Sequence, residues 1–215
     1  MTANNLVASK KHSRIWIATD GASYDDHGVV GDIKSKIRAV PEWPAVITGR
    51  GNTLGIDTAA GELRRRAANF DDLVGIVSRE LPQIVEQFKL DRPFELNLAG
   101  FFRGRPMIFF IRTPGGHDSS GFGLQPYLCL PVGSTMFGPW EPGFVEPDPD
   151  DAPENIASSL RDLIKLQRRV LVDDGYSRVG GFAELTTVTP EGIEQHVIHR
   201  WPEDCIGARM SIGEH

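Results

Sequence analysis

The stretch Ile15–Gly51 constrains the fold of this chain most, because it places a charge on either side of what should be a packed β-layer. It runs through an apolar strand that ends at Asp20, a polar turn with glycines, Lys36, a second apolar strand and further glycines. An isolated ion near a protein core is costly unless an opposite charge or hydrogen bonds compensate it. We therefore predict that Asp20 and Lys36 pair, either as structural support or as part of an active site.

Segments with a hydrophobic period of two alternate along the chain with blocks of helical period. Strands are predicted over residues 4–9, 14–19, 32–39, 45–48, 94–100, 107–111, 127–132, 182–189 and 193–201. Helices are predicted after Asn52, after the cap residue Asn69 and from Asp151–Glu154, and Pro82 is expected to kink or restart the second helix. Because hairpins join the strands and the helices form separate blocks, this order predicts an α+β fold with helices outside two antiparallel sheets.

Length and composition predict a single domain over residues 1–215, with a Pro-rich acidic loop at 138–153. The net charge of −6 argues against a nucleic-acid partner, which normally binds a basic surface. No apolar run approaches the ~18 residues of a membrane span, and the start of the chain lacks the apolar core of a signal peptide. Cys129 and Cys205 show neither metal-ligand nor disulfide spacing, so we expect a cytoplasmic protein without metal or cofactor.

Two smaller motifs have simpler interpretations than binding sites. His196 and His199 are three residues apart on a predicted strand, so their side chains would point to opposite faces and could not share a metal ion. Gly49 and Gly51 precede a predicted helix and could bind a phosphate, but the segment lacks the lysine of a P-loop. A tight strand-to-helix turn is the favoured interpretation of these glycines.

Four motifs in a fixed order carry a resemblance to a known family. Asp20 ends the second strand, and Lys36 follows it by sixteen residues. The segment Gly49–Gly51 precedes the first helix, Val132-Gly-Ser134 follows the middle strands, and Asp174-Gly-Tyr-Ser177 follows the third helix. Over roughly residues 4–200 this arrangement resembles the proteasome β-subunit type of Ntn hydrolase, including the bacterial proteasome-like peptidases.

The resemblance implies a fold, an assembly and a chemistry. It implies a four-layer αββα sandwich of antiparallel sheets, a homo-oligomer, and a peptide or amide substrate. In that family a hydroxyl at a free N-terminus attacks the substrate, with its own α-amine as the base. The site residues implied for this chain are Thr2 as nucleophile after removal of Met1, Asp20, Lys36, Ser134, Asp174 and Ser177, with backbone N–H groups of Gly49 and Gly51 as the oxyanion hole.

The departure from the family pattern lies at the nucleophile. Counting sixteen residues back from Asp20 leads to Asn4, which has no hydroxyl, whereas Thr2 comes two residues earlier. Two strand residues correspond to ~6.6 Å, and the turn Lys10–Ser13 would have to absorb them. Three functions therefore remain open: a threonine-type peptidase, a catalytically inactive assembly or binding module, and a small-molecule amidase.

Overall fold

The computed structural model describes residues 3–115, 124–139, 143–171 and 175–210. The chain forms two compact units, and each unit is assembled from segments that are distant in the sequence. The first unit comprises residues 1–36, 134–187 and 194–215, and the second comprises residues 37–133 and 188–193.

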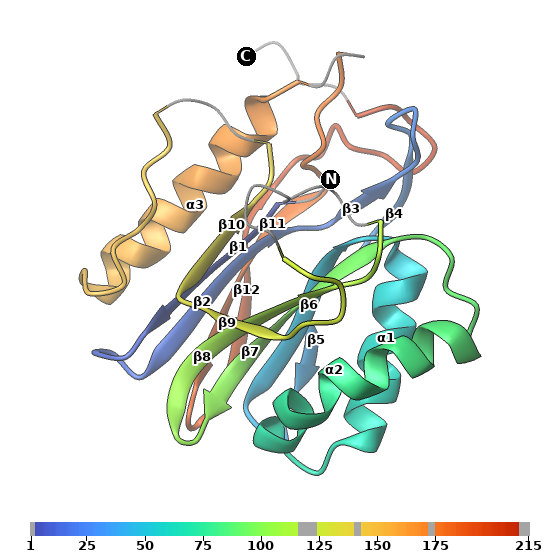
Figure 1. Cartoon of the computed structure of the whole chain (residues 1–215). Helices are drawn as coiled ribbons and strands as arrows, with labels where there is room; N and C mark the ends of the chain where they lie inside the picture. Colours follow the sequence, from blue (N-terminus) through green and yellow to red (C-terminus); the bar gives the residue numbers. More distant parts are fainter. Residues whose placement is uncertain (1–2, 116–123, 140–142, 172–174, 211–215) are drawn as a thin grey trace. The chain divides into compact units, whose positions relative to one another are not determined.

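The first unit is built on a five-stranded sheet in the order β10-β1-β2-β11-β12, with a short β3–β4 hairpin beside it (Figure 1). Its elements are β1 (Asn4–Ser9), β2 (Arg14–Asp20), β3 (Ala22–Tyr24), β4 (Val30–Ile33), β10 (Ser134–Phe137), α3 (Pro153–Arg169), β11 (Phe182–Thr189) and β12 (Gly192–Arg200). Strand β1 pairs antiparallel with both β2 and β10. The β1–β2 pairs run without interruption from Asn4 opposite Thr19 to Ser9 opposite Arg14.

Helix α3 covers one face of this sheet (Figure 1). Val7 of β1 and Trp16 and Ala18 of β2 are buried together with Ile156 and Leu160 of α3. Because successive side chains of a strand point to opposite faces, the neighbours of Val7, Trp16 and Ala18 along each strand point away from α3. Every second side chain of β1 and β2 therefore belongs to the helix-covered face.

The second unit is built on a five-stranded antiparallel sheet in the order β5-β6-β7-β8-β9. Its elements are β5 (Arg38–Val40), β6 (Ala45–Gly51), α1 (Thr53–Arg66), α2 (Phe70–Gln87), β7 (Phe94–Phe102), β8 (Arg105–Arg112) and β9 (Leu130–Val132). Both helices begin at an asparagine whose side-chain oxygen accepts a backbone hydrogen bond, from Gly55 to Asn52 and from Asp72 to Asn69. The predicted cap at Asn69 is confirmed, and Asn52 is a second cap of the same kind.

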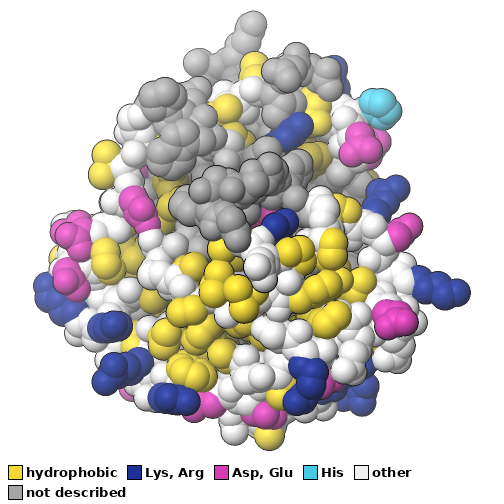
Figure 2. Space-filling model, viewed as in Figure 1, with side chains coloured by type: hydrophobic (Ala, Val, Ile, Leu, Met, Phe, Trp, Pro, Cys, Tyr) yellow, Lys and Arg dark blue, Asp and Glu magenta, His cyan; other side chains and the backbone are white. Residues whose placement is uncertain are grey.

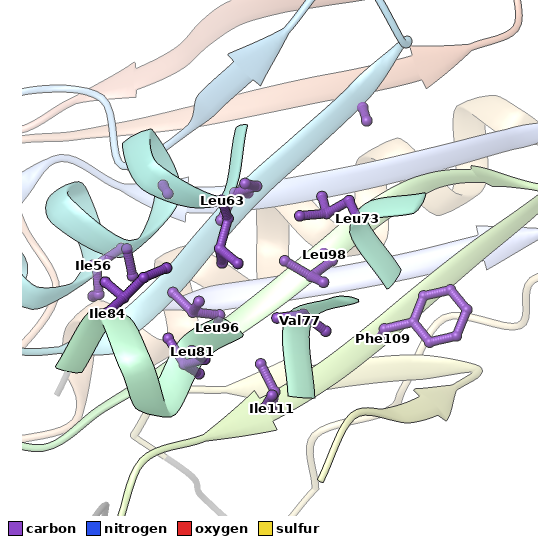
Figure 3. Close-up of a cluster of buried hydrophobic side chains, with 14 of the residues drawn as sticks. Ile56, Leu63, Leu73, Val77, Leu81, Ile84, Leu96, Leu98, Phe109 and Ile111 are labelled. Carbon is purple, nitrogen blue, oxygen red and sulfur yellow. The ribbon is translucent and has the colours of Figure 1, made fainter. Parts of the chain in front are cut away.

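One apolar cluster joins α1 and α2 to the sheet of the second unit. Figure 3 shows its labelled side chains, which are Ile56 and Leu63 from α1, Leu73, Val77, Leu81 and Ile84 from α2, Leu96 and Leu98 from β7, and Phe109 and Ile111 from β8. Fully burying an aliphatic or aromatic side chain of this size contributes ~1.5–3 kcal/mol. The cluster is therefore the main source of stability in this unit.

The predicted fold class is confirmed, because the described residues form an α+β structure of antiparallel sheets and three helices. The predicted strand 32–39 was wrong: β4 ends at Ile33 and β5 begins at Arg38, since the chain leaves one sheet to enter another. Helix α2 continues through Pro82 without a restart, because Leu81 and Ile84 on both sides of it are held in the apolar cluster.

Three further elements escaped prediction. The polar turn after Asp20 contains the β3–β4 hairpin, and β10 follows directly after the predicted middle strands. The C-terminal segment pairs with the start of β4, since Val30 N–H donates to the Ala208 carbonyl (2.9 Å) and Gly207 N–H donates to the Val30 carbonyl (2.8 Å). None of the helices in the described part of the chain has the length and apolar character needed to span a bilayer.

Candidate active site

The Asp20 carboxylate is the centre of the site. It lies at the end of β2, is fully buried, and accepts three hydrogen bonds from parts of the chain that are far apart in sequence. Its Oδ1 accepts from Lys36 Nζ at 2.8 Å and from the Ala3 backbone nitrogen at 3.0 Å. Its Oδ2 accepts from the Gly180 backbone nitrogen at 3.1 Å. This carboxylate therefore ties the start of the chain, the segment after β4 and the segment before β11 together.

The ion pair predicted from the sequence is confirmed. The Lys36 side chain is 12% exposed and the Asp20 side chain is 0% exposed, so the pair is largely shielded from water. Removing one partner from such a pair leaves an uncompensated buried charge, which costs ~3–5 kcal/mol. The pair consequently stabilises the fold whether or not the site is catalytic.

Ser177 lies in the segment that reaches Asp20, but its hydroxyl is used within its own turn. Ser177 is fully buried, and its Oγ accepts a hydrogen bond from Val179 N at 3.1 Å and donates one to the Val179 carbonyl at 3.1 Å. The contact with Asp20 comes from Gly180, three residues further along the chain. Ser177 thus shapes the turn that delivers the Gly180 N–H group.

Asn4 occupies the strand position that the sequence count identified as the family's nucleophile position. It is fully buried, and both polar atoms of its side-chain amide lack a hydrogen-bond partner among the described residues. Ala3 precedes the strand and receives a hydrogen bond at its carbonyl from Asp20 N (3.4 Å). The pairing of β1 with β2 has no bulge, so any extra residues of this hairpin would lie in the turn Lys10–Ser13.

Ser134 is not brought to the Asp20–Lys36 pair. It begins β10 opposite Val7, and its hydroxyl contacts the Glu146 carboxylate. The residue opposite Asn4 is Phe137, three positions further along β10. The Ser134 hydroxyl is thus engaged by Glu146 in the described residues, and its role in the site stays a prediction.

Gly49 and Gly51 lie in the second unit, at the end of β6 before α1. A Cβ atom at Gly49 would lie 2.1 Å from the Glu95 carbonyl oxygen, and one at Gly51 would lie 2.6 Å from the Pro93 carbonyl oxygen. Gly51 also has a φ of +103°, which side chains disfavour. The observed role of both glycines is close packing against β7 at a strand-to-helix turn, as the simpler interpretation of this segment predicted.

Two predicted site residues, Thr2 and Asp174, lie outside the described residues. Among the residues that the structure does describe, no group of His, Cys, Asp and Glu side chains is arranged to hold a metal ion. The described part of the site is thus one buried ion pair with backbone donors from Ala3 and Gly180.

A second set of contacts behind Gly180 supports the site, and it was not predicted from the sequence. Arg168 of α3 pairs with Asp204 (Nη2 to Oδ1, 2.7 Å) and donates through Nη1 to the Val179 carbonyl (2.6 Å). Asp204 Oδ2 accepts from the Gly181 backbone nitrogen at 2.7 Å. The glycine doublet 180–181 was the only local signal, because the segment that carries Asp204 has no hydrophobic period.

Comparison with known proteins shows similarity of fold. The chain resembles the structure of Anbu (ancestral beta-subunit) from Yersinia bercovieri, with a TM-score of 0.65 and 12% identity over 93% of this chain and 88% of that one. It resembles equally an Anbu (Gly-1) mutant from Hyphomicrobium sp. strain MC1, with a TM-score of 0.67 and 13% identity over 94% and 89% of the two chains. No protein family and no curated protein matches the sequence.

These comparisons correct the family resemblance drawn from the sequence. That resemblance named the bacterial proteasome-like peptidases, whereas the two matching structures are Anbu proteins. At 12% and 13% identity the likeness extends to the fold alone. The chain shares the fold of these two structures, and any activity has to be argued from its own residues.

Proposed function

We propose that this chain is an N-terminal nucleophile hydrolase that cleaves amide or peptide bonds with Thr2, after removal of Met1. The observation that carries the proposal is that one carboxylate oxygen of Asp20 accepts hydrogen bonds from both Lys36 Nζ and the backbone nitrogen of Ala3. Thr2 is joined to this nitrogen by a peptide bond. Because one residue spans at most ~3.6 Å of chain, this connection supports the proposal that Thr2 acts beside the Lys36 ammonium.

The proposed chemistry has two steps. The Thr2 hydroxyl attacks the substrate carbonyl while its own α-amine takes the hydroxyl proton, and the resulting intermediate expels the leaving amine with that proton. The acyl group then forms an ester on Thr2, which a water molecule hydrolyses with the α-amine again as base. The Lys36 ammonium favours deprotonated forms of the groups near it, and Asp20 fixes its position.

The other predicted residues have secondary roles in this proposal. Asp174 and Ser177 orient the α-amine, Ser177 through the turn that its hydroxyl stabilises. The proposed chemistry does not depend on Ser134, whose hydroxyl contacts Glu146 and which pairs away from Asn4.

A second candidate function is a non-catalytic assembly or binding protein on the same fold. This function is favoured by Asn4, because the position sixteen residues before Asp20 holds a buried residue that has no hydroxyl. Thr2 also lies two residues before the position sixteen residues ahead of Asp20, and the paired strands β1 and β2 contain no bulge that would shift it. In this case the Asp20–Lys36 pair has only its structural role.

Intact-mass measurement and three variants separate the two functions. We expect the purified protein to lack Met1, Thr2→Ser to retain hydrolysis, and Thr2→Ala to lose it. Thr58→Ala on α1 is the matched control and should leave the activity unchanged. A panel of peptides and simple amides distinguishes a peptidase from a small-molecule amidase. Retained Met1, or full activity in Thr2→Ala, would contradict the proposed hydrolase.

We also propose that the protein self-associates. Several large hydrophobic side chains are exposed on the described chain: Leu54, Phe88, Leu128, Val145, Leu166, Leu171, Val197 and Ile206. Figure 2 shows hydrophobic side chains gathered on part of one face. Exposed apolar patches of this kind are common at protein–protein interfaces. Light scattering on a size-exclusion column should give a mass above 23.7 kDa, and a monomer at all concentrations would contradict self-association.

A further inference from the structure

Two hydrogen-bond donors beside Asp20 have no partner in the described part of the chain. The hydroxyl of Tyr24, on β3, is buried and makes no hydrogen bond. The Nε atom of Arg178 is also buried without a partner. The two unpartnered atoms are buried, whereas other parts of both side chains are exposed to solvent. Buried polar atoms usually have a partner, and a set of them without one indicates a binding site.

The backbone brings these two residues to one place in the first unit. The first residue of β3 donates a hydrogen bond from its N–H group to the Gly180 carbonyl, at 2.9 Å, so β3 begins beside the segment that carries Arg178. The Tyr24 ring packs edge-on against Tyr176, with ring centroids 6.1 Å apart. Tyr176 is in turn held by a hydrogen bond from its hydroxyl to the Asp26 carbonyl. These contacts hold the Tyr24 ring against Tyr176, which precedes Arg178 by two residues in the neighbouring segment.

The charges of Asp20 and Arg178 also act on the Tyr24 hydroxyl. Burial raises the pKa of Tyr24 well above its usual value, the Asp20 carboxylate raises it further, and the Arg178 guanidinium lowers it. The phenol therefore stays protonated and can only donate its hydrogen to an anion near neutral pH. Arg178 remains charged under the same conditions.

The charges and donors define the ligand class. The guanidinium fork of Arg178 matches the two oxygens of a carboxylate, and the Tyr24 hydroxyl supplies another donor. The Asp20–Lys36 pair is balanced in charge, so we expect the Arg178 guanidinium to be the group that attracts the anion, and its fork suits a carboxylate.

We propose that Arg178 and Tyr24 bind a carboxylate group of a ligand next to the Asp20–Lys36 pair. This site goes beyond the proposed hydrolysis, because binding of the carboxylate requires no reaction at Thr2. Binding can therefore be measured in a protein that has no activity at all, and each proposal can fail without the other.

The test compares three probes by NMR on the full-length protein, observed at the Arg Nε–H resonances at constant pH and ionic strength. N-acetylglycine carries the carboxylate, N-acetylglycinamide is its neutral match, and inorganic phosphate is the alternative anion. We expect N-acetylglycine to shift the Arg178 resonance in a saturable way and N-acetylglycinamide to leave it unchanged. Phosphate should bind more weakly than N-acetylglycine.

Variants locate the site. Arg178→Met should abolish binding of N-acetylglycine, observed at backbone resonances around Gly180. Tyr24→Phe should weaken it by about tenfold, as expected for one hydrogen bond to a charged group. Since the hydroxyl has no partner in the described residues, this variant should fold normally. Arg14→Met is the matched control, because Arg14 is also half-buried with an unpartnered Nε atom, but lies against Trp16.

Several results would overturn the carboxylate site. These are equal shifts with the acid and the amide, tighter binding of phosphate, unchanged affinity in Tyr24→Phe, or an equal loss of binding in Arg14→Met. If Arg178→Met does not fold, Tyr24→Phe alone decides the matter.

Discussion

Replacing Lys36 with methionine tests whether the buried ion pair supports the fold. The substitution keeps most of the side-chain volume and leaves the fully buried Asp20 carboxylate without its counter-ion. Such a loss costs ~3–5 kcal/mol, and we expect the lower end of this range. The reason is that Asp20 retains two hydrogen bonds from the backbone nitrogens of Ala3 and Gly180. For a chain of this length ~3 kcal/mol corresponds to a fall in melting temperature of ~6–12 °C.

The measurement is chemical denaturation of the wild type and four variants. Lys34→Met is the matched control, because the Lys34–Asp32 pair is about half exposed and its loss should cost less than ~1 kcal/mol. In Lys36→Met/Asp20→Asn both charges are absent, so the double variant should lose less stability than the sum of the two single variants. Equal effects of Lys36→Met and Lys34→Met, with additive losses in the double variant, would refute the reasoning.

Three further outcomes follow from packing and burial. Gly49→Ala should destabilise the protein by ~1–3 kcal/mol in denaturation, because the new Cβ would lie 2.1 Å from the Glu95 carbonyl oxygen; unchanged stability would contradict this packing. Leu81→Ala should cost ~2–5 kcal/mol, since Leu81 is fully buried in the cluster of Figure 3; a loss under ~1 kcal/mol would argue against that core. Burial raises the pKa of Cys129 to about 12, so iodoacetamide at pH 8 should alkylate exposed Cys205 first, as peptide mass mapping can show; equal rates would contradict the burial.

Local signals explain what the sequence predicted well. Asn52 and Asn69 each bond a backbone N–H group three residues ahead, so their caps depend on nothing distant. The pairing of Asp20 with Lys36 was predictable for a different reason. Each residue stands at the edge of an apolar segment, where an uncompensated charge is costly and an opposite charge is needed nearby.

Pairing between distant segments was not predictable in the same way. Ser134 was predicted to belong to the site because a glycine precedes it. The residue of β10 that lies opposite Asn4 depends on the register between β10 and β1, and it is Phe137. A strand's own sequence specifies its faces far better than its offset along a partner. The contact of Ala208 with Val30 was missed for a related reason, since it uses backbone groups only and leaves no side-chain pattern.

The residues that hold this site together are physically separable from the group that would react there. Asp20 is satisfied by Lys36, Ala3 and Gly180, and none of these bonds requires a nucleophile. Stability alone is therefore sufficient to retain the ion pair, whichever function the chain has. Asn4 is different, because a buried amide without a described partner lowers stability by ~1–3 kcal/mol. What distinguishes the proposed hydrolase from a binding protein is thus the chemistry at positions 2 and 4, and not the buried pair that first drew attention to the site.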